Sequence, residues 1–232
     1  SWLIETMAAE ERSVASSYHF PLRRTLTSPR VWALAVVYFG VAYGLYALAF
    51  FLPTIVAGFK TTFALQLSLI EVGLITAIPY VFGAISMFIC SRHADRTGEH
   101  VWHVAIPLFA GGLAIPVALY LNHPIAVMAL VVIAAMGIFA ALPVFWALPS
   151  RFLTGAAAAG GIGLINSVGN LGGFAAPYAT GALEDLTGTN RAGMWAVGMI
   201  MVLGGVLVVW LRATPDPDVA ATPSPSRGAS NG

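Results

Sequence analysis

Two asparagines are the polar side chains of this sequence that stand out most within apolar surroundings. Asn166 and Asn170 are four residues apart, which places them on one face of a helix, and the stretch around them is rich in glycine. A carboxamide donates and accepts hydrogen bonds, so the pair suits the hydroxyl and carboxylate groups of a polar ligand. The pair equally suits interhelical hydrogen bonding, because Gly169-x-x-x-Gly173 permits close helix packing. Both interpretations remain open.

Tyrosines add hydroxyl groups to the same kind of apolar surroundings. Tyr38, Tyr43 and Tyr46 fall in one apolar stretch, and Tyr80 follows the helix-kinking Pro79 in the next. A pocket for a small molecule typically has apolar walls and a few convergent polar groups. Each tyrosine could also serve packing alone. The predicted ligand contacts are Tyr46, Asn166, Asn170, Tyr38 and Tyr80.

This sequence contains none of the catalytic or metal-binding motifs named below. An enzyme within a membrane would need a nucleophile with a base, or a cluster of metal ligands. The sequence has no Gly-x-Ser-x-Gly and no His-Glu-x-x-His, and its histidines fall in or beside the connections between apolar stretches. With Cys90 as the single cysteine, no disulfide can form within the chain. We therefore expect no enzyme, no metal and no cofactor.

The elements that must position these side chains are membrane helices. Hydrophobic residues make up 58% of the chain and charged residues 9%, and the net charge of +1 gives no reason to expect nucleic acid. Apolar runs long enough to cross a bilayer lack the alternation of barrel strands, so they must be helices. The predicted class is all-α integral membrane, with six transmembrane helices at Val31–Val56, Ser68–Cys90, Val104–Leu121, Ile125–Trp146, Ala156–Gly181 and Gly193–Leu211.

Basic residues predict the orientation of these helices. Nine arginines fall in the termini and alternate connections on one side, against Lys60 and Arg191 on the other. The positive-inside rule then places both termini in the cytoplasm. Tryptophans near predicted helix ends are interpreted as interfacial anchors (Trp32, Trp102, Trp195 and Trp210). Trp146 also suits an anchor, with a secondary role at the ligand site as the alternative.

Ionisable groups are almost absent from the predicted membrane interior. Only Glu71 enters an apolar stretch, near the outer end of the second helix. Glu71 could serve ion coupling, since intramembrane acids often do, or it could sit in a solvated first turn and favour the helix dipole. The coupling machinery is therefore expected in another part of the protein.

The two ends of the chain differ from the apolar region between them. The chain opens at Ser1 in a polar segment of the kind that joins two halves of a larger membrane protein. Residues 1–30 are predicted to be a cytoplasmic central-loop segment, and residues 31–211 the transmembrane unit. Residues 212–232 are rich in Pro, Ser and Ala and are predicted to be a disordered cytoplasmic tail.

One charged segment resembles a known family signature. Ser91-Arg92-His93-Ala94-Asp95-Arg96-Thr97-Gly98-Glu99 resembles the cytoplasmic loop signature of the major facilitator superfamily, which lies between the second and third helices of a half. Ser91 stands where the signature usually has glycine, and Glu99 and His100 replace its basic pair. The resemblance implies that Arg92, Asp95, Arg96 and Gly98 form a cytoplasmic gate.

Further segments are similar to one branch of that family. A set of three motifs looks like the anion:cation symporter branch: Phe145-Trp146-Ala147-Leu148-Pro149, then Phe152-Leu153-Thr154-Gly155, then Ile165-Asn166-Ser167-Val168-Gly169-Asn170-Leu171-Gly172-Gly173-Phe174. Thr76-Ala77-Ile78-Pro79-Tyr80 and Phe51-Leu52-Pro53-Thr54 are similar to it as well. The likeness covers roughly residues 1–211. Members of this branch move organic anions such as sugar acids, dicarboxylates or aromatic acids together with protons.

This resemblance implies that the chain is the C-terminal half of a twelve-helix fold that works by alternating access. Tyr46 and Asn166 or Asn170 match substrate-facing positions, whereas Tyr38 and Tyr80 align less securely. The expected partners are a small organic anion, a coupling proton, the lipid bilayer and a missing N-terminal six-helix half. The expected location is the inner (cell) membrane of a bacterium. A truncated remnant or partner subunit that does not transport is the alternative.

Overall fold

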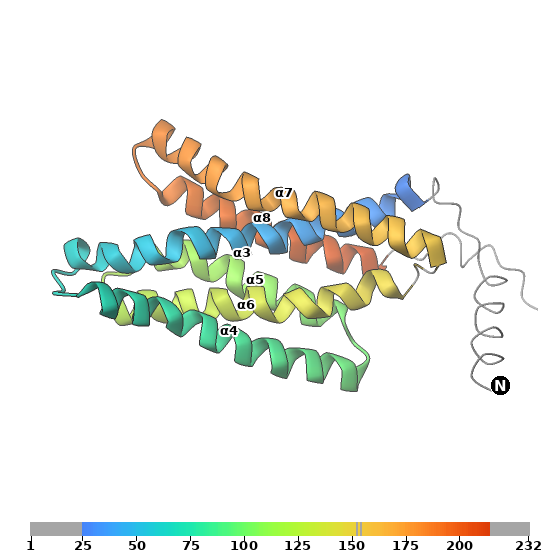
Figure 1. The fold of residues 1–232 in the computed structure, drawn as a ribbon, viewed down its shortest axis with the longest axis horizontal. Helices are drawn as coiled ribbons and strands as arrows, with labels where there is room; N and C mark the ends of the chain where they lie inside the picture. The colour runs from blue at the N-terminus through green and yellow to red at the C-terminus, as the bar shows by residue number, and fades with distance from the viewer. Residues whose placement is uncertain (1–24, 152, 154, 214–232) are drawn as a thin grey trace, which may run out of the picture.

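The computed structural model describes residues 25–151, 153 and 155–213, and this part of the chain folds into six helices. Each of the six predicted stretches forms one long helix, and consecutive helices run in opposite directions (Figure 1). The predicted tail from residue 214 onward and the first 24 residues of the predicted central-loop segment lie outside the described residues. The helices are α3 (Pro29–Thr62), α4 (Leu69–Thr97), α5 (Val101–Ala118), α6 (Pro124–Ser150), α7 (Gly155–Thr187) and α8 (Arg191–Ala213).

Local sequence signals explain where α4 begins and ends. Ser68 caps its N-terminus: the Ser68 hydroxyl accepts a hydrogen bond from the Glu71 N–H at 3.2 Å, and the Ser68 N–H donates to the Glu71 carboxylate at 2.7 Å. At the other end Gly98 adopts a left-handed conformation, with φ of 69°, and its N–H bonds the Ala94 carbonyl. The helix therefore extends beyond Cys90, where its apolar stretch was predicted to end.

The helices form a front layer and a back pair. In the front layer α3 and α6 lie between α7 on one side and α4 on the other (Figure 1). Helices α5 and α8 pack against each other, with α5 covering α6 and α8 covering α3. We call the side of α3 and α6 that is turned away from α5 and α8 the front face. The end of the bundle where α3 begins and α4 ends is called the basic end.

Glycines bring several of these helices into close contact. A Cβ atom added at Gly137 of α6 would lie 3.1 Å from the Gly111 Cα of α5. A Cβ at Gly172 of α7 would lie 2.9 Å from both the Phe39 carbonyl oxygen and the Tyr43 nitrogen of α3. Small residues allow membrane helices to approach this closely and gain dispersion contacts. The glycine-rich α7 therefore does serve packing, as one reading of the sequence predicted.

Five of the described helices are long and apolar enough to cross a membrane, namely α3, α4, α5, α6 and α8. Helix α7 has 33 residues and ample length, but its glycines and two asparagines lower its hydropathy. Helix α4 is the least covered of the five, with many large apolar side chains exposed along it.

Candidate substrate-facing site

The paired asparagines lie exposed on α7 and bond to each other. The Asn170 Nδ2 donates to the Asn166 side-chain oxygen at 2.9 Å and to the Asn166 backbone oxygen at 2.8 Å. Within the described residues, neither amide bonds another helix, so the interhelical reading gains no support from this half. One amide hydrogen-bonds the other and thereby orients it, leaving the Asn166 NH₂ group and the Asn170 oxygen open to a ligand.

Tyr46 packs against α7 beside these amides. A Cβ atom at Gly173 would lie 2.7 Å from the Tyr46 ring, so only glycine leaves room for the ring there. At about 100° per residue, Gly173, Asn166 and Asn170 fall within an arc of roughly 60° on α7. The phenol and both amides therefore share one side of α7, along the edge where α7 meets α3.

Tyr38 is positioned by aromatic contacts. Its ring stacks on Phe145 of α6 at a centroid distance of 5.1 Å and meets Trp146 edge-on at 4.7 Å. The ring also occupies the space that a side chain at Gly169 would need. Gly40 marks the side of α3 that packs against α8. Around the axis of α3, Tyr38 lies about 160° and Tyr46 about 120° from Gly40. Both rings therefore belong to the front face.

Tyr43 and Tyr80 lie apart from this group. Tyr43 is buried, with 1% exposure, and its hydroxyl lacks a hydrogen bond of normal geometry. Around the axis of α3 it lies only about 60° from Gly40, the residue that packs against α8. Tyr80 of α4 meets Phe139 of α6 edge-on at 6.0 Å. Phe139 is seven residues, roughly 10 Å along the helix, from Trp146. The structure thus brings together Tyr38, Tyr46 and the amides, but not Tyr80.

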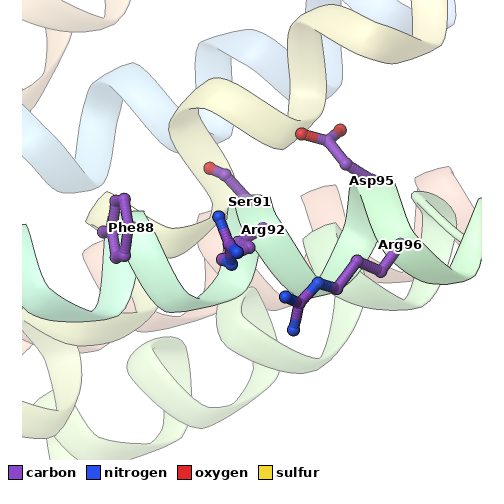
Figure 2. A pocket seen from close by; sticks show the side chains of 5 residues that line it. All are labelled: Phe88, Ser91, Arg92, Asp95 and Arg96. Atoms are coloured by element: carbon purple, nitrogen blue, oxygen red, sulfur yellow. The ribbon is translucent and has the colours of Figure 1, made fainter.

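The residues of the predicted gate are helical rather than part of a loop. Arg92, Asp95 and Arg96 occupy the last turns of α4, and only Gly98 lies past its end. The reason is that nothing in this segment breaks a helix before Gly98, and a helix can continue past the membrane into water. Together with Phe88 and Ser91, these three charged residues line an open pocket of about 470 Å³ (Figure 2).

Hydrogen bonds tie the end of α4 to its neighbours. The Gly98 carbonyl accepts a hydrogen bond from the Arg151 guanidinium at 2.8 Å. Glu99 pairs with Arg212 of α8 at 3.2 Å. Sequence reasoning counted Arg151 and Arg212 only as orientation signals and missed these contacts. No local signal could have found them, because they join segments more than 50 residues apart.

Two histidines of the same region also meet across helices. The His93 Nδ1 of α4 and the His103 Nε2 of α5 are 2.5 Å apart, and the other His103 nitrogen faces the Glu99 carbonyl. In the neutral form of His103, donation to that carbonyl leaves its Nε2 as the acceptor, and His93 then donates the proton between the two rings. The described residues contain no group of three or more His, Cys, Asp or Glu side chains that could hold a metal.

Comparisons with known proteins agree with this architecture. The family model of the Major Facilitator Superfamily matches residues 34–230. A putative tartrate transporter of Agrobacterium vitis is 40% identical over 93% of this chain and 46% of its own length. A quinolone resistance transporter of Acinetobacter baumannii is 36% identical over 89% of the chain and 46% of its own length.

A third relative, the inner membrane transport protein RhmT of Escherichia coli (strain K12), is 36% identical over 90% of the chain and 47% of its length. The chain thus spans about half the length of the curated relatives that it matches, as expected for one six-helix half of the fold. The family is one of transporters, which argues against the enzyme alternative. This chain therefore belongs to the major facilitator superfamily and is an integral membrane protein.

Proposed function

We propose that this chain is the C-terminal half of a transporter that moves a small organic anion together with a proton. The observation that carries the proposal is the gathering of Asn166, Asn170 and Tyr46 on one side of the helix layer. Their open hydrogen-bonding groups lie amid apolar side chains, which is the usual composition of a small-molecule site. Two relatives from Agrobacterium vitis are named putative tartrate transporters, and tartrate is an organic anion.

The distribution of charge suggests that the two halves have different roles in binding and coupling. No Asp, Glu, Lys or Arg occurs in residues 31–59, 72–91, 101–150, 155–183 or 192–211. This half can therefore bind hydroxyl groups and orient a carboxylate, but it offers no buried cation to neutralise one. An arginine for the anion and an acid for the proton would come from the N-terminal half. This assignment fits the anion:cation symporter branch of the family.

Transport would proceed by rocking of the two halves around the site. By the positive-inside rule the basic end would face the cytoplasm. There Arg92, Asp95, Arg96 and Gly98 would form the gate, and the bonds from Arg151 and Arg212 would hold the loop after α4 in place.

The test is uptake by the complete transporter carrying Asn166→Ala, Asn170→Ala or Tyr46→Phe. Loss of one hydrogen bond of about 0.5–1.5 kcal/mol weakens apparent affinity roughly 2- to 10-fold. Ser167→Ala, also exposed on α7, is the matched control and should leave the KM unchanged. Unchanged affinity in all three variants, at normal expression, would refute the site.

A remnant that does not transport is the second candidate, because the chain spans only half of its relatives. Sequencing the gene upstream of Ser1 separates the two. An in-frame continuation with six further apolar stretches, including an intramembrane acid and arginine, supports the transporter. An independent start or a stop codon at that point supports the remnant.

A further inference from the structure

Trp146 differs from every other tryptophan in the described part of the chain. The others are 40–55% exposed: Trp32, Trp102, Trp195 and Trp210. Trp32 and Trp195 donate their indole N–H to groups near helix ends, and Trp102 lies under the Arg212 guanidinium. This is how interfacial anchors behave. Trp146 is instead partly buried among aromatic rings, so the anchor reading does not account for it.

The position of Trp146 around α6 directs it to the front face. Gly137 packs against α5, and Trp146, nine residues later, points about 180° away from it. Partly exposed residues continue along the same side at Phe139 and Leu142, whereas Val144 and Phe145 beside them are buried. These partly exposed residues form a row along α6. At one end of the row Phe139 contacts Tyr80 of α4, and at the other end Trp146 contacts Tyr38 of α3.

Contacts hold the indole at the level of the amide pair. Trp146 packs edge-on against Tyr38 at 4.7 Å and against Phe145 at 5.3 Å. Tyr38 in turn lies against Gly169 of α7, the residue immediately before Asn170. The phenol ring of Tyr38 therefore lies between the Trp146 indole and the segment of α7 that carries the amides. The indole thus lies against two neighbouring rings, Tyr38 and Phe145.

We propose that Trp146 is a specificity-determining residue of the transport site, whose indole forms the wall for the apolar face of the substrate. The amides of Asn166 and Asn170 would hydrogen-bond to the polar edge of the substrate. An aromatic ring in the substrate gains from an offset or edge-on contact with the indole beyond simple burial, whereas an acyclic hydroxy acid gains little. This inference rests on the proposed function, because it assigns a further residue to the same site.

The experiment compares three acids in the complete transporter: tartrate, gluconate and 4-hydroxybenzoate. The KM for uptake of each acid, or its inhibition constant where it only competes, is measured for the parent protein and for Trp146→Ala and Trp146→Phe. We expect Trp146→Ala to weaken 4-hydroxybenzoate about tenfold and tartrate less than about threefold. Trp146→Phe should recover most of the loss, because it keeps an aromatic wall.

Two controls separate specificity from packing. Trp195→Phe removes an exposed indole whose N–H bonds Tyr120, and it should leave the ratio of the constants unchanged. Folding of each variant is checked by its thermal midpoint. Equal weakening of all three acids, or a loss of maximal rate alone, would overturn the role of Trp146. If Asn166→Ala, Asn170→Ala and Tyr46→Phe change affinity while Trp146→Ala does not, only this inference fails. If none of the three acids is taken up or competes, both proposals fail.

Discussion

Glu71 illustrates how a single residue acquires its role from local geometry. It is the one acid within a predicted apolar stretch, where it could have been a coupling group. In the structure its carboxylate accepts hydrogen bonds from the N–H and the hydroxyl of Ser68, and its own N–H bonds that hydroxyl. All of these bonds lie within one turn, so the capping box follows from the order of the residues and needs no partner helix.

Removal of this cap should lower stability without stopping transport. Ser68→Ala leaves a helix N–H unpaired, which costs about 0.5–2 kcal/mol, so we expect a lower thermal midpoint of the complete transporter and near-normal uptake. Gln66→Ala, in the exposed connection before the cap, should change neither quantity. An opposite result, with Glu71→Gln abolishing uptake at an unchanged midpoint, would assign Glu71 to ion coupling.

Helix α7 combines close packing on one side with exposed polar groups, the proposed substrate contacts, on another. Gly169, Gly172 and Gly173 face α3, and the paired amides lie on the adjoining exposed side. The sequence predicted both uses as alternatives for the same stretch. The structure shows the glycine packing on the side that faces α3 and the amides exposed on the adjoining side, where we propose that they bind the substrate.

Glycine substitutions on α7 should therefore have opposite effects on its two sides. At Gly172 an alanine Cβ would lie 2.9 Å from backbone atoms of α3, which cannot yield as a flexible side chain can. At Gly163 an added Cβ meets nothing within 4 Å. We expect Gly172→Ala to lower the thermal midpoint and the yield of folded protein. Gly163→Ala should be neutral or stabilising by up to about 1 kcal/mol, because alanine favours helix. Equal midpoints would contradict the packing described here.

At the scale of the whole molecule, the basic end is organised by contacts between distant segments. Arg151 bonds the residue that ends α4, and Arg212 pairs with Glu99 in the connection to α5. These two contacts link the ends of α4, α6 and α8. The proposed rocking of this half would require rigidity at this end.

Removal of the hydrogen bond from Arg151 to Gly98 should make the basic end more mobile. Arg151→Gln loses the charged donor to the Gly98 carbonyl, and we expect faster hydrogen exchange in the connection between α4 and α5 and a lower uptake rate. Arg191→Gln, at the opposite end over Tyr120, is the control for charge and should leave that connection unchanged. Exchange that is the same in both variants would show that the bond contributes nothing.

The orientation in the membrane can be tested by cysteine labelling in a Cys90→Ser background. Thr97→Cys at the basic end should react with a membrane-impermeant maleimide only after the cells are opened, whereas Thr62→Cys should react in intact cells. Both positions are exposed. The reverse pattern would invert the proposed topology.

Much of this protein follows from its sequence alone. Six apolar stretches of membrane length must be helices, because lipid offers no partner for a free N–H or C=O group, and the Ser68 and Gly98 signals delimit α4. The sequence also marked Asn166, Asn170 and Tyr46, because polar groups are rare in such stretches. It did not show that Arg92, Asp95 and Arg96 are helical, since charged residues past the membrane carry no apolar period that marks a helix.

The tertiary structure decided which of the candidates meet. Tyr38, Tyr43 and Tyr46 are equivalent as residues in one apolar stretch, yet two belong to the front face and one lies in the core. The difference arises because Gly40 directs one side of α3 onto α8, and glycines of α7 leave room for two rings on another side. Tyr80 contacts Phe139 of α6 and lies apart from this group, and Trp146 joins the group through Tyr38. Such contacts depend on the packing of helices distant in the chain, which residue types and spacing alone do not specify.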